Sequence, residues 1–91
     1  MIREIRQSKQ FKRDLKKARL RGFDMTLIDE VVGLLREGKP LPPKYSDHPL
    51  KGNLKGFREC HIAPDWLLVY RYEADVLILV LQRTGSHSDL F

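Results

Sequence analysis

Residues 47–72 read DHPLKGNLKGFRECHIAPDWLLVYRY, and this stretch decides the fold expected for the 91-residue chain. Its segments at 57–62 and 66–72 are rich in aromatic and β-branched residues, which favour strands. The Ala-Pro-Asp break between them carries the residue types that turns prefer. The stretch therefore predicts a β-hairpin that holds His61 and Asp65 close together.

Two further histidines are expected near this hairpin. Gly52 and Gly56 lie just before it, and glycine lets the backbone bend sharply or approach a ligand closely. We therefore expect His48 to fold back over the hairpin. His87 should reach the same region from the C-terminal tail.

The N-terminal half predicts an edge strand and then two helices. Residues 2–6 form a short alternating segment that is typical of a strand. Ser8 and Asp24 can each cap a helix N-terminus, and the apolar residues of 9–20 and 27–35 recur at helical spacing after them. The two helices should form an antiparallel pair whose shared apolar face needs a sheet to cover it.

The fold class follows from the order of these elements. The prolines within residues 39–44 keep that segment extended, so it should connect the helices to the sheet. Residues 76–84, VLILVLQRT, begin apolar on both faces and predict a central strand after a turn at 73–75. We expect residues 1–91 to form one α+β domain, with two N-terminal helices packed on one face of a mainly antiparallel sheet.

Strand alternation predicts which side chains lie together. Glu59 and His61 share one side of their strand, and Arg83 shares a side with Leu81 in the last strand. The face opposite the helices can therefore carry polar side chains, whereas Cys60 should point into the core.

Charge and composition restrict the partners. The net charge of +5 and the pI near 9.6 favour a polyanionic partner, either nucleic acid or an acidic protein. The lysines and arginines of residues 9–21 are either a solvated helix face or part of such a contact. Cys60 has no second cysteine to pair with, and no apolar run approaches the ~20 residues of a membrane span. A reducing cytoplasm and no membrane partner are therefore expected.

The chemistry that these residues favour is acid–base catalysis. Imidazole takes and gives protons near neutral pH. RNA cleavage through its own 2′-hydroxyl needs one group to remove the 2′-proton, one to protonate the leaving 5′-oxygen and a cation beside the phosphate. The candidates for proton transfer are His48, His61, Asp65 and His87. Arg83 can supply the cation, and Phe91 can stack on a base.

The same residues allow other interpretations. A lone histidine is usually an ordinary surface or hydrogen-bonded residue. A zinc site is not favoured, because the His–His spacings of 13 and 26 residues match no compact zinc signature. A thiol nucleophile is not favoured either, because alternation points Cys60 and His61 to opposite faces.

Three segments carry a resemblance to a known family. DHPLKG, GFRECHIAPDWLLVYRY and the ending RTGSHSDLF are similar to the YafQ-type branch of the RelE/ParE toxin superfamily, and the similarity covers essentially the whole chain. The resemblance implies a RelE-like β-α-α-β-β-β fold. It also implies a toxin of a type II toxin–antitoxin system, which cleaves mRNA on the ribosome and is neutralised by a cognate antitoxin with an acidic segment.

The resemblance also implies roles for single residues. His48, His61, Asp65 and His87 match the family's catalytic positions. Arg83, Phe91 and Glu59 are expected to bind RNA, with neither metal nor cofactor required. The chain departs from the family at Glu59, where a relative carries aspartate, and at Leu54, where an aromatic residue is common. Two alternatives stay open: a ParE-like toxin that only occupies its target, and a non-catalytic nucleic-acid-binding module.

Overall fold

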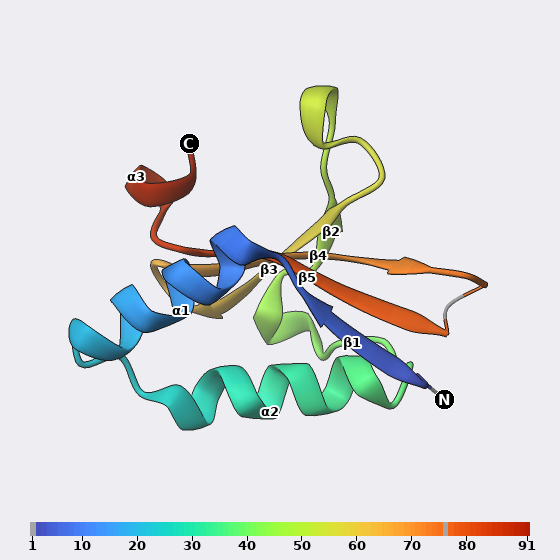
Figure 1. The fold of residues 1–91 in the computed structure, drawn as a ribbon, viewed down its shortest axis with the longest axis horizontal. Coiled ribbons are helices and arrows are strands. Elements are labelled where there is room, and N and C mark those ends of the chain that lie inside the picture. The colour runs from blue at the N-terminus through green and yellow to red at the C-terminus, as the bar shows by residue number, and fades with distance from the viewer. Residues whose placement is uncertain (1, 76) are drawn as a thin grey trace.

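Over residues 2–75 and 77–91, which the computed structural model describes, the chain folds as a five-stranded sheet with two helices against one face (Figure 1). The helices and strands are, in chain order, β1 (Glu4–Gln7), α1 (Lys9–Leu20), α2 (Met25–Arg36), β2 (His48–Pro49), β3 (Arg58–Ala63), β4 (Trp66–Glu73), β5 (Ile78–Gly85) and α3 (His87–Leu90). Short 3₁₀ helices lie at Pro43–Tyr45 and Gly52–Leu54. The predicted α+β class, with two helices on one face of a mainly antiparallel sheet, is confirmed.

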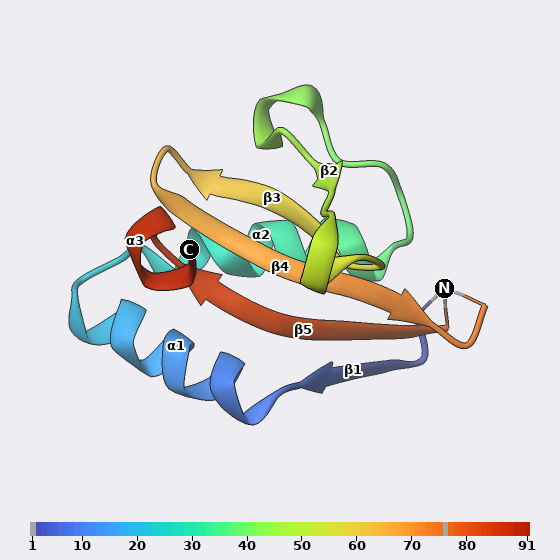
Figure 2. The ribbon, with the colours of Figure 1, turned by 90° about the horizontal axis from the view of Figure 1, so that it is seen from above.

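The sheet has the strand order β1-β5-β4-β3-β2. β1 pairs with β5 in parallel, and every other neighbouring pair is antiparallel. Figure 2 shows this order face-on, with α2 behind the sheet and α1 beside the part of β5 that extends past β1. The central position of β5 and the edge position of β1 agree with the prediction from the sequence.

The strands differ from the prediction in number and in bounds: β1 begins at Glu4 and not at position 2, and β3 begins at Arg58 and not at position 57. The two-residue strand β2 was not predicted, because a pairing of only two residues leaves no periodic pattern in the sequence. The last strand begins at Ile78 and not at position 76, since Leu77 still belongs to the turn. That turn contains Ala74 and Asp75 at φ values of 51° and 56°. Val76, where the predicted strand began, lies outside the described residues.

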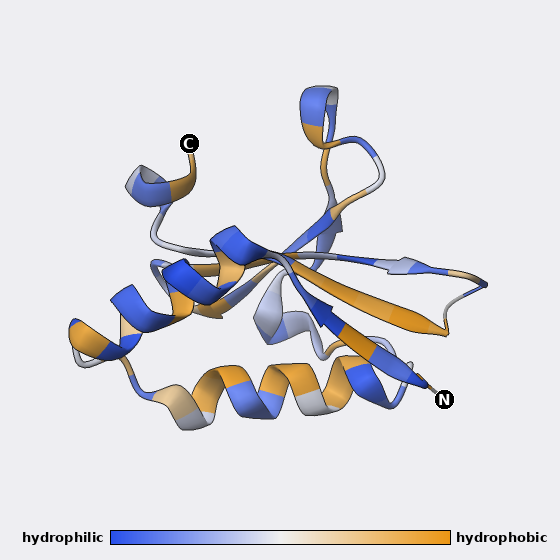
Figure 3. Ribbon diagram, viewed as in Figure 1, coloured by the Kyte–Doolittle hydropathy of each residue, from blue (hydrophilic) through white to orange (hydrophobic). Residues whose placement is uncertain are grey.

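Both predicted helix caps form. The Ser8 hydroxyl accepts a hydrogen bond from the Phe11 amide at 2.9 Å, and the Asp24 carboxylate accepts one from the Thr26 amide at 3.0 Å. In Figure 3 the hydrophobic residues follow β5 and much of α2, whereas α1 carries long hydrophilic stretches. The two helices bury Phe11, Ala18, Ile28, Val31 and Leu35 in the core. None of the described helices has the length and the hydropathy to span a bilayer.

Rows of directly paired residues cross the sheet and define its two faces. Cys60, Leu68 and Thr84 form one such row, and Cys60 and Leu68 belong to the core beneath the helices. The next row, Glu59, Val69 and Arg83, lies on the opposite face.

The predicted parity of Arg83 with Leu81 is wrong. A register shift between β4 and β5 pairs Tyr70 with Leu81 but Val69 with Arg83. Leu81 therefore packs in the core below the sheet, and the extra residue in β5 turns Arg83 to the other face.

A buried hydroxyl ties the middle strands together. Thr84 is 1% exposed; its hydroxyl donates to the Leu67 carbonyl at 2.7 Å and accepts from the Trp66 indole at 2.9 Å. Both bonds join β4 to β5 beneath the helices. They anchor the end of β5 from which the C-terminal tail departs.

We predict that Thr84→Val lowers the free energy of unfolding by about 1–3 kcal/mol, because it leaves the buried Trp66 N–H without an acceptor. Urea unfolding followed by far-UV circular dichroism measures this loss. Trp66→Phe removes the indole N–H that Thr84→Val leaves unpaired. Its cost in unfolding free energy should therefore be smaller in the Thr84→Val protein than in the wild type. An unchanged midpoint for Thr84→Val would contradict the predicted effect.

Candidate active site

The candidate site lies on the sheet face opposite the helices. Figure 1 shows α3 and the loop after β2 both rising from this face, on the side away from α2. His61 and Glu59 belong to β3 and alternate with the buried Cys60. The polar face predicted from strand alternation is therefore present.

The β3–β4 turn and the C-terminal tail meet at a histidine–aspartate pair. His87 Nδ1 lies 2.7 Å from Asp65 Oδ1, and the His87 backbone N–H donates to the same oxygen at 3.0 Å. These two contacts, the backbone bond first, hold the pKa of Asp65 below its usual range. The His61 ring stands edge-on to the His87 ring with centroids 5.7 Å apart. The structure thus brings together three of the four residues predicted for proton transfer.

The fourth residue, His48, lies on the same face one strand further out. β2 places it directly opposite Glu59, with His48 Nε2 3.4 Å from Glu59 Oε1. The other ring nitrogen, Nδ1, lies 2.8 Å from the Ser46 carbonyl. His61 follows Glu59 by two residues, so the rise of a strand puts the two Cα atoms about 7 Å apart. His48 therefore folds back onto β3, as the bend before the hairpin predicted, and it lies opposite Glu59, two residues along the strand from His61.

Glu59 is less accessible than a residue expected to bind RNA directly. It is 6% exposed, and one of its oxygens, Oε2, is buried without a hydrogen-bond partner among the described residues. The carboxylate therefore faces His48 from below, where it can orient the imidazole.

Arg83 is held from the side by the first helix. Its Nε donates to Asp14 Oδ2 at 2.8 Å and its Nη2 to Asp14 Oδ1 at 3.3 Å. Asp14 is 8% exposed and also accepts from the Thr84 backbone amide at 3.1 Å. Sequence reasoning missed this carboxylate, although it is the single acidic residue of KQFKRDLKKARL and so stood out from the basic helix.

An exposed aromatic ring and a buried anchor lie at the two ends of the histidine face. Phe91, at the end of the tail, is 65% exposed. Behind the sheet, Tyr70 and Arg58 bind Asp47 at 2.6 Å and 3.1 Å and so hold the segment that leads into His48. Within the described residues, no set of three His, Cys, Asp or Glu side chains is arranged to hold a metal ion.

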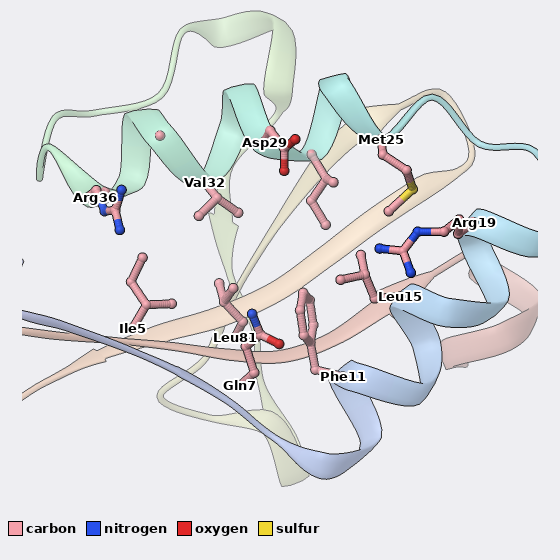
Figure 4. Close-up of a pocket in the computed structure, with 12 residues that line it drawn as sticks. Ile5, Gln7, Phe11, Leu15, Arg19, Met25, Asp29, Val32, Arg36 and Leu81 are labelled. Carbon is pink, nitrogen blue, oxygen red and sulfur yellow. The ribbon is translucent and has the colours of Figure 1, made fainter.

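A hollow of about 570 Å³ lies on the opposite side of the molecule, between α1, α2 and β1. Figure 4 shows side chains from both helices and both neighbouring strands pointing into it. Phe11, Leu15, Val32 and Leu81 form part of its apolar lining. It shares none of its lining residues with the histidine face, so the protein has two separate surfaces on which a partner can lie.

The fold and the histidine face together define a small basic α+β protein that carries acid–base groups on an open sheet. A family model described as a bacterial toxin of type II toxin-antitoxin system, YafQ, matches residues 3–91. The chain belongs to this YafQ family of toxins.

Relatives with known names and structures agree with this assignment. The mRNA interferase toxin YafQ of Escherichia coli K12 is 41% identical over 90 residues, 98% of this chain and 96% of the relative. The E. coli DinJ–YafQ toxin–antitoxin complex contains a chain with a TM-score of 0.90 and 40% identity, covering 100% of this chain and 99% of that one. A metal-bound toxin from Helicobacter pylori has a TM-score of 0.90 and 54% identity over the full length of both chains.

We predict that the Cys60 thiol is inert in the folded protein. Cys60 is fully buried, and burial raises the pKa of its thiol to about 12 from an ordinary value of 9.0. Iodoacetamide at pH 8, followed by mass spectrometry, should leave the native chain unmodified and alkylate it in urea.

The same pKa shift predicts a loss of stability at alkaline pH. An unfolded thiol ionises near pH 9 and the folded one near 12, so ionisation favours the unfolded chain as the pH rises above 9. Cys60→Ala should lose stability less steeply over that range. Rapid alkylation of the native chain at pH 8 would refute the prediction that the Cys60 thiol is inert.

Proposed function

We propose that this protein is the toxin of a type II toxin–antitoxin system and an mRNA interferase, an endoribonuclease that uses the RNA's own 2′-hydroxyl. The observation that carries the proposal is the His87–Asp65 pair beside His61, with contacts of 2.7 Å and 3.0 Å to one carboxylate oxygen. Family membership and the name of the E. coli relative support the same activity.

In the proposed reaction two imidazoles divide the proton transfers. One removes the 2′-proton, the 2′-oxygen forms a bond to phosphorus, and the bond from phosphorus to the 5′-oxygen breaks as another imidazole protonates that oxygen. Asp65 accepts from His87 Nδ1–H and so leaves His87 Nε2 to face the substrate. The second imidazole of the reaction is either His61 or His48, which lies beside Glu59.

Arg83 is proposed to stabilise the charge that develops on the phosphate. Asp14 binds its Nε and Nη2 and so fixes the guanidinium plane, while Nη1 stays outside that pair. A preorganised cation of this kind stabilises a transition state without rearranging during the reaction. The exposed Phe91 ring is proposed to stack on a base of the RNA.

Cleavage is proposed to take place on the ribosome, in the cytoplasm. The histidines lie on an open sheet face, so a second surface is needed to hold the RNA in line with them. The resemblance to the YafQ branch supports ribosomal mRNA as the substrate, and the net charge of +5 favours binding to a ribonucleoprotein surface.

We propose that the cognate antitoxin binds the hollow between α1, α2 and β1 with an apolar segment that carries acidic residues. Arg19 and Arg36 line it beside apolar side chains and match such a segment in charge, and they outnumber Asp29, the acidic residue of the lining (Figure 4). The DinJ–YafQ complex of E. coli supports an antitoxin as the partner. This location differs from the lysines and arginines of residues 9–21, which the net charge alone makes the first candidates for contact with an acidic partner.

We predict that His87→Ala lowers the cleavage rate about 10²- to 10⁴-fold, the usual contribution of one acid–base group, while the fold stays intact. The assay adds protein to programmed ribosomes and to free mRNA and maps the cuts. Cys60→Ser, on the core side of the same sheet, should keep near-normal activity. Cleavage within a few-fold of wild type in His87→Ala would remove His87 from the mechanism.

Product analysis in the same assay tests the chemistry. Wild-type cleavage should leave a 2′,3′-cyclic phosphate or 3′-phosphate on one fragment and a 5′-hydroxyl on the other, and a 2′-deoxy nucleotide at the scissile position should block it. A 5′-phosphate product would overturn the 2′-hydroxyl mechanism. Translation arrest without any cut would favour a toxin that only occupies its target.

We predict that Val32→Glu, in the apolar lining of the hollow, weakens antitoxin binding at least about tenfold, because it buries a charge in the interface. Isothermal titration with the purified antitoxin measures the loss. Cleavage should remain within about twofold of wild type, since the histidines lie on the other face. Leu20→Glu, the same kind of change at a 79% exposed position outside the hollow, is the matched control. Unchanged affinity in Val32→Glu would place the antitoxin elsewhere.

A further inference from the structure

The C-terminal helix α3 is only partly covered by the rest of the protein: His87 and Ser88 are exposed, and Asp89 and Leu90 are half-buried. None of its four residues is buried, and a helix of this length is unstable on its own in water. The Ser86 hydroxyl and the Asp89 carboxylate cap its first turn reciprocally. Apart from the half-buried Leu90, polar contacts of its side chains hold it over the sheet, and His87–Asp65 is one of them.

The second attachment joins Asp89 to the last turn of α1. Arg21 donates to the two Asp89 carboxylate oxygens from Nη1 at 2.7 Å and Nη2 at 3.1 Å, and Lys17 Nζ lies 3.3 Å from Oδ1. Lys17 and Arg21 are four residues apart, so both lie on the helix face toward α3. The Asp89 side chain is 16% exposed, whereas Lys17 and Arg21 are 57% and 40% exposed.

The backbone before α3 is shaped to fit this contact. A Cβ atom added at Gly85 would lie 3.0 Å from the Asp89 Cβ and 3.1 Å from Asp89 Oδ2. Glycine at this position therefore lets the carboxylate tuck against the end of β5 while it faces Arg21. The amide of Ser86 also donates to Asp89 Oδ2 at 2.9 Å.

We propose that Lys17 and Arg21 are positioning residues for the candidate active site, because through Asp89 they hold α3 where His87 meets Asp65 and His61. This inference rests on the proposed function for its catalytic consequence. It also assigns part of the basic face of α1: these two cations bind the protein's own tail.

The charge state of Asp89 agrees with this role. The Arg21 hydrogen bonds first, and then the Ser86 amide, hold the pKa of Asp89 far below its usual range. The carboxylate therefore stays charged throughout the neutral range in which imidazoles transfer protons. Because the cations are exposed, each ion pair is weak alone, and the two-pronged Arg21 contact provides most of the geometric restraint.

The test compares Arg21→Gln with Arg21→Lys and Gly85→Ala. The heteronuclear {¹H}–¹⁵N NOE of the amides of residues 87–91 measures the order of the tail, and kcat and KM for cleavage on programmed ribosomes measure its catalytic effect. Arg21→Gln should lower the NOE values and reduce kcat about tenfold or more, since small displacements of a catalytic group are costly. Arg21→Lys should restore part of both.

Two further variants separate charge from position. Gly85→Ala should reproduce the Arg21→Gln result without changing any charge, because the added methyl group displaces Asp89. Lys12→Gln, an equal loss of charge at an exposed position on α1, should leave the NOE values and kcat unchanged. Thermal unfolding confirms that each variant remains folded.

Each outcome decides a different point. A tail that stays as ordered as wild type in both Arg21→Gln and Gly85→Ala would overturn the anchoring. A disordered tail with unchanged kcat would overturn the positioning role. A tail that loosens as expected in a protein that never cuts mRNA, wild type included, would overturn the proposed function while supporting the anchoring.

Discussion

The buried carboxylate of Asp14 is the interaction on which the arrangement of both layers depends. β5 extends past the end of β1, so its backbone there would be an open edge. α1 closes this edge: Ser8 binds the carbonyls of Leu81 and Gln82, and Asp14 accepts from the Thr84 amide at 3.1 Å. A buried carboxylate is stable only when its oxygens are bonded, and Gln10 and Arg83 complete the set. One side chain thus fixes the helix, the strand edge and Arg83, the arginine proposed to bind phosphate.

Alternation along β3 and β4 places the side chains of the core and those of the candidate site on opposite faces of the sheet. Side chains that face the helices, such as Cys60 and Leu68, are fully buried, and their neighbours His61 and Glu59 point to the other face. The register shift in β5 extends this division to Arg83. The candidate site is therefore assembled on the outer face of a sheet whose inner face makes the core.

The sequence allowed the helices, their caps, the hairpin and the central strand to be predicted, because each rests on local patterns. The grouping of His61 with Asp65 followed from the hairpin turn, and the return of His48 from Gly52 and Gly56. Contacts between residues that are 68 or 69 positions apart in the chain leave no such pattern. The Asp14–Arg83 and Arg21–Asp89 pairs belong to this kind, and the register shift that reorients Arg83 depends on how two strands pair. The pairings that complete the site were therefore visible only in the structure.

The separation of the histidine face from the hollow between the helices has a genetic consequence, if both surfaces act as proposed. A gene copy that loses a histidine would still encode a folded protein with an intact hollow (Figure 4). Such a protein would bind the antitoxin without cutting any mRNA. Less free antitoxin would then remain to inhibit an active toxin in the same cell. Inactivation of one allele would then raise the toxicity of another, so decay of the active site would not be neutral.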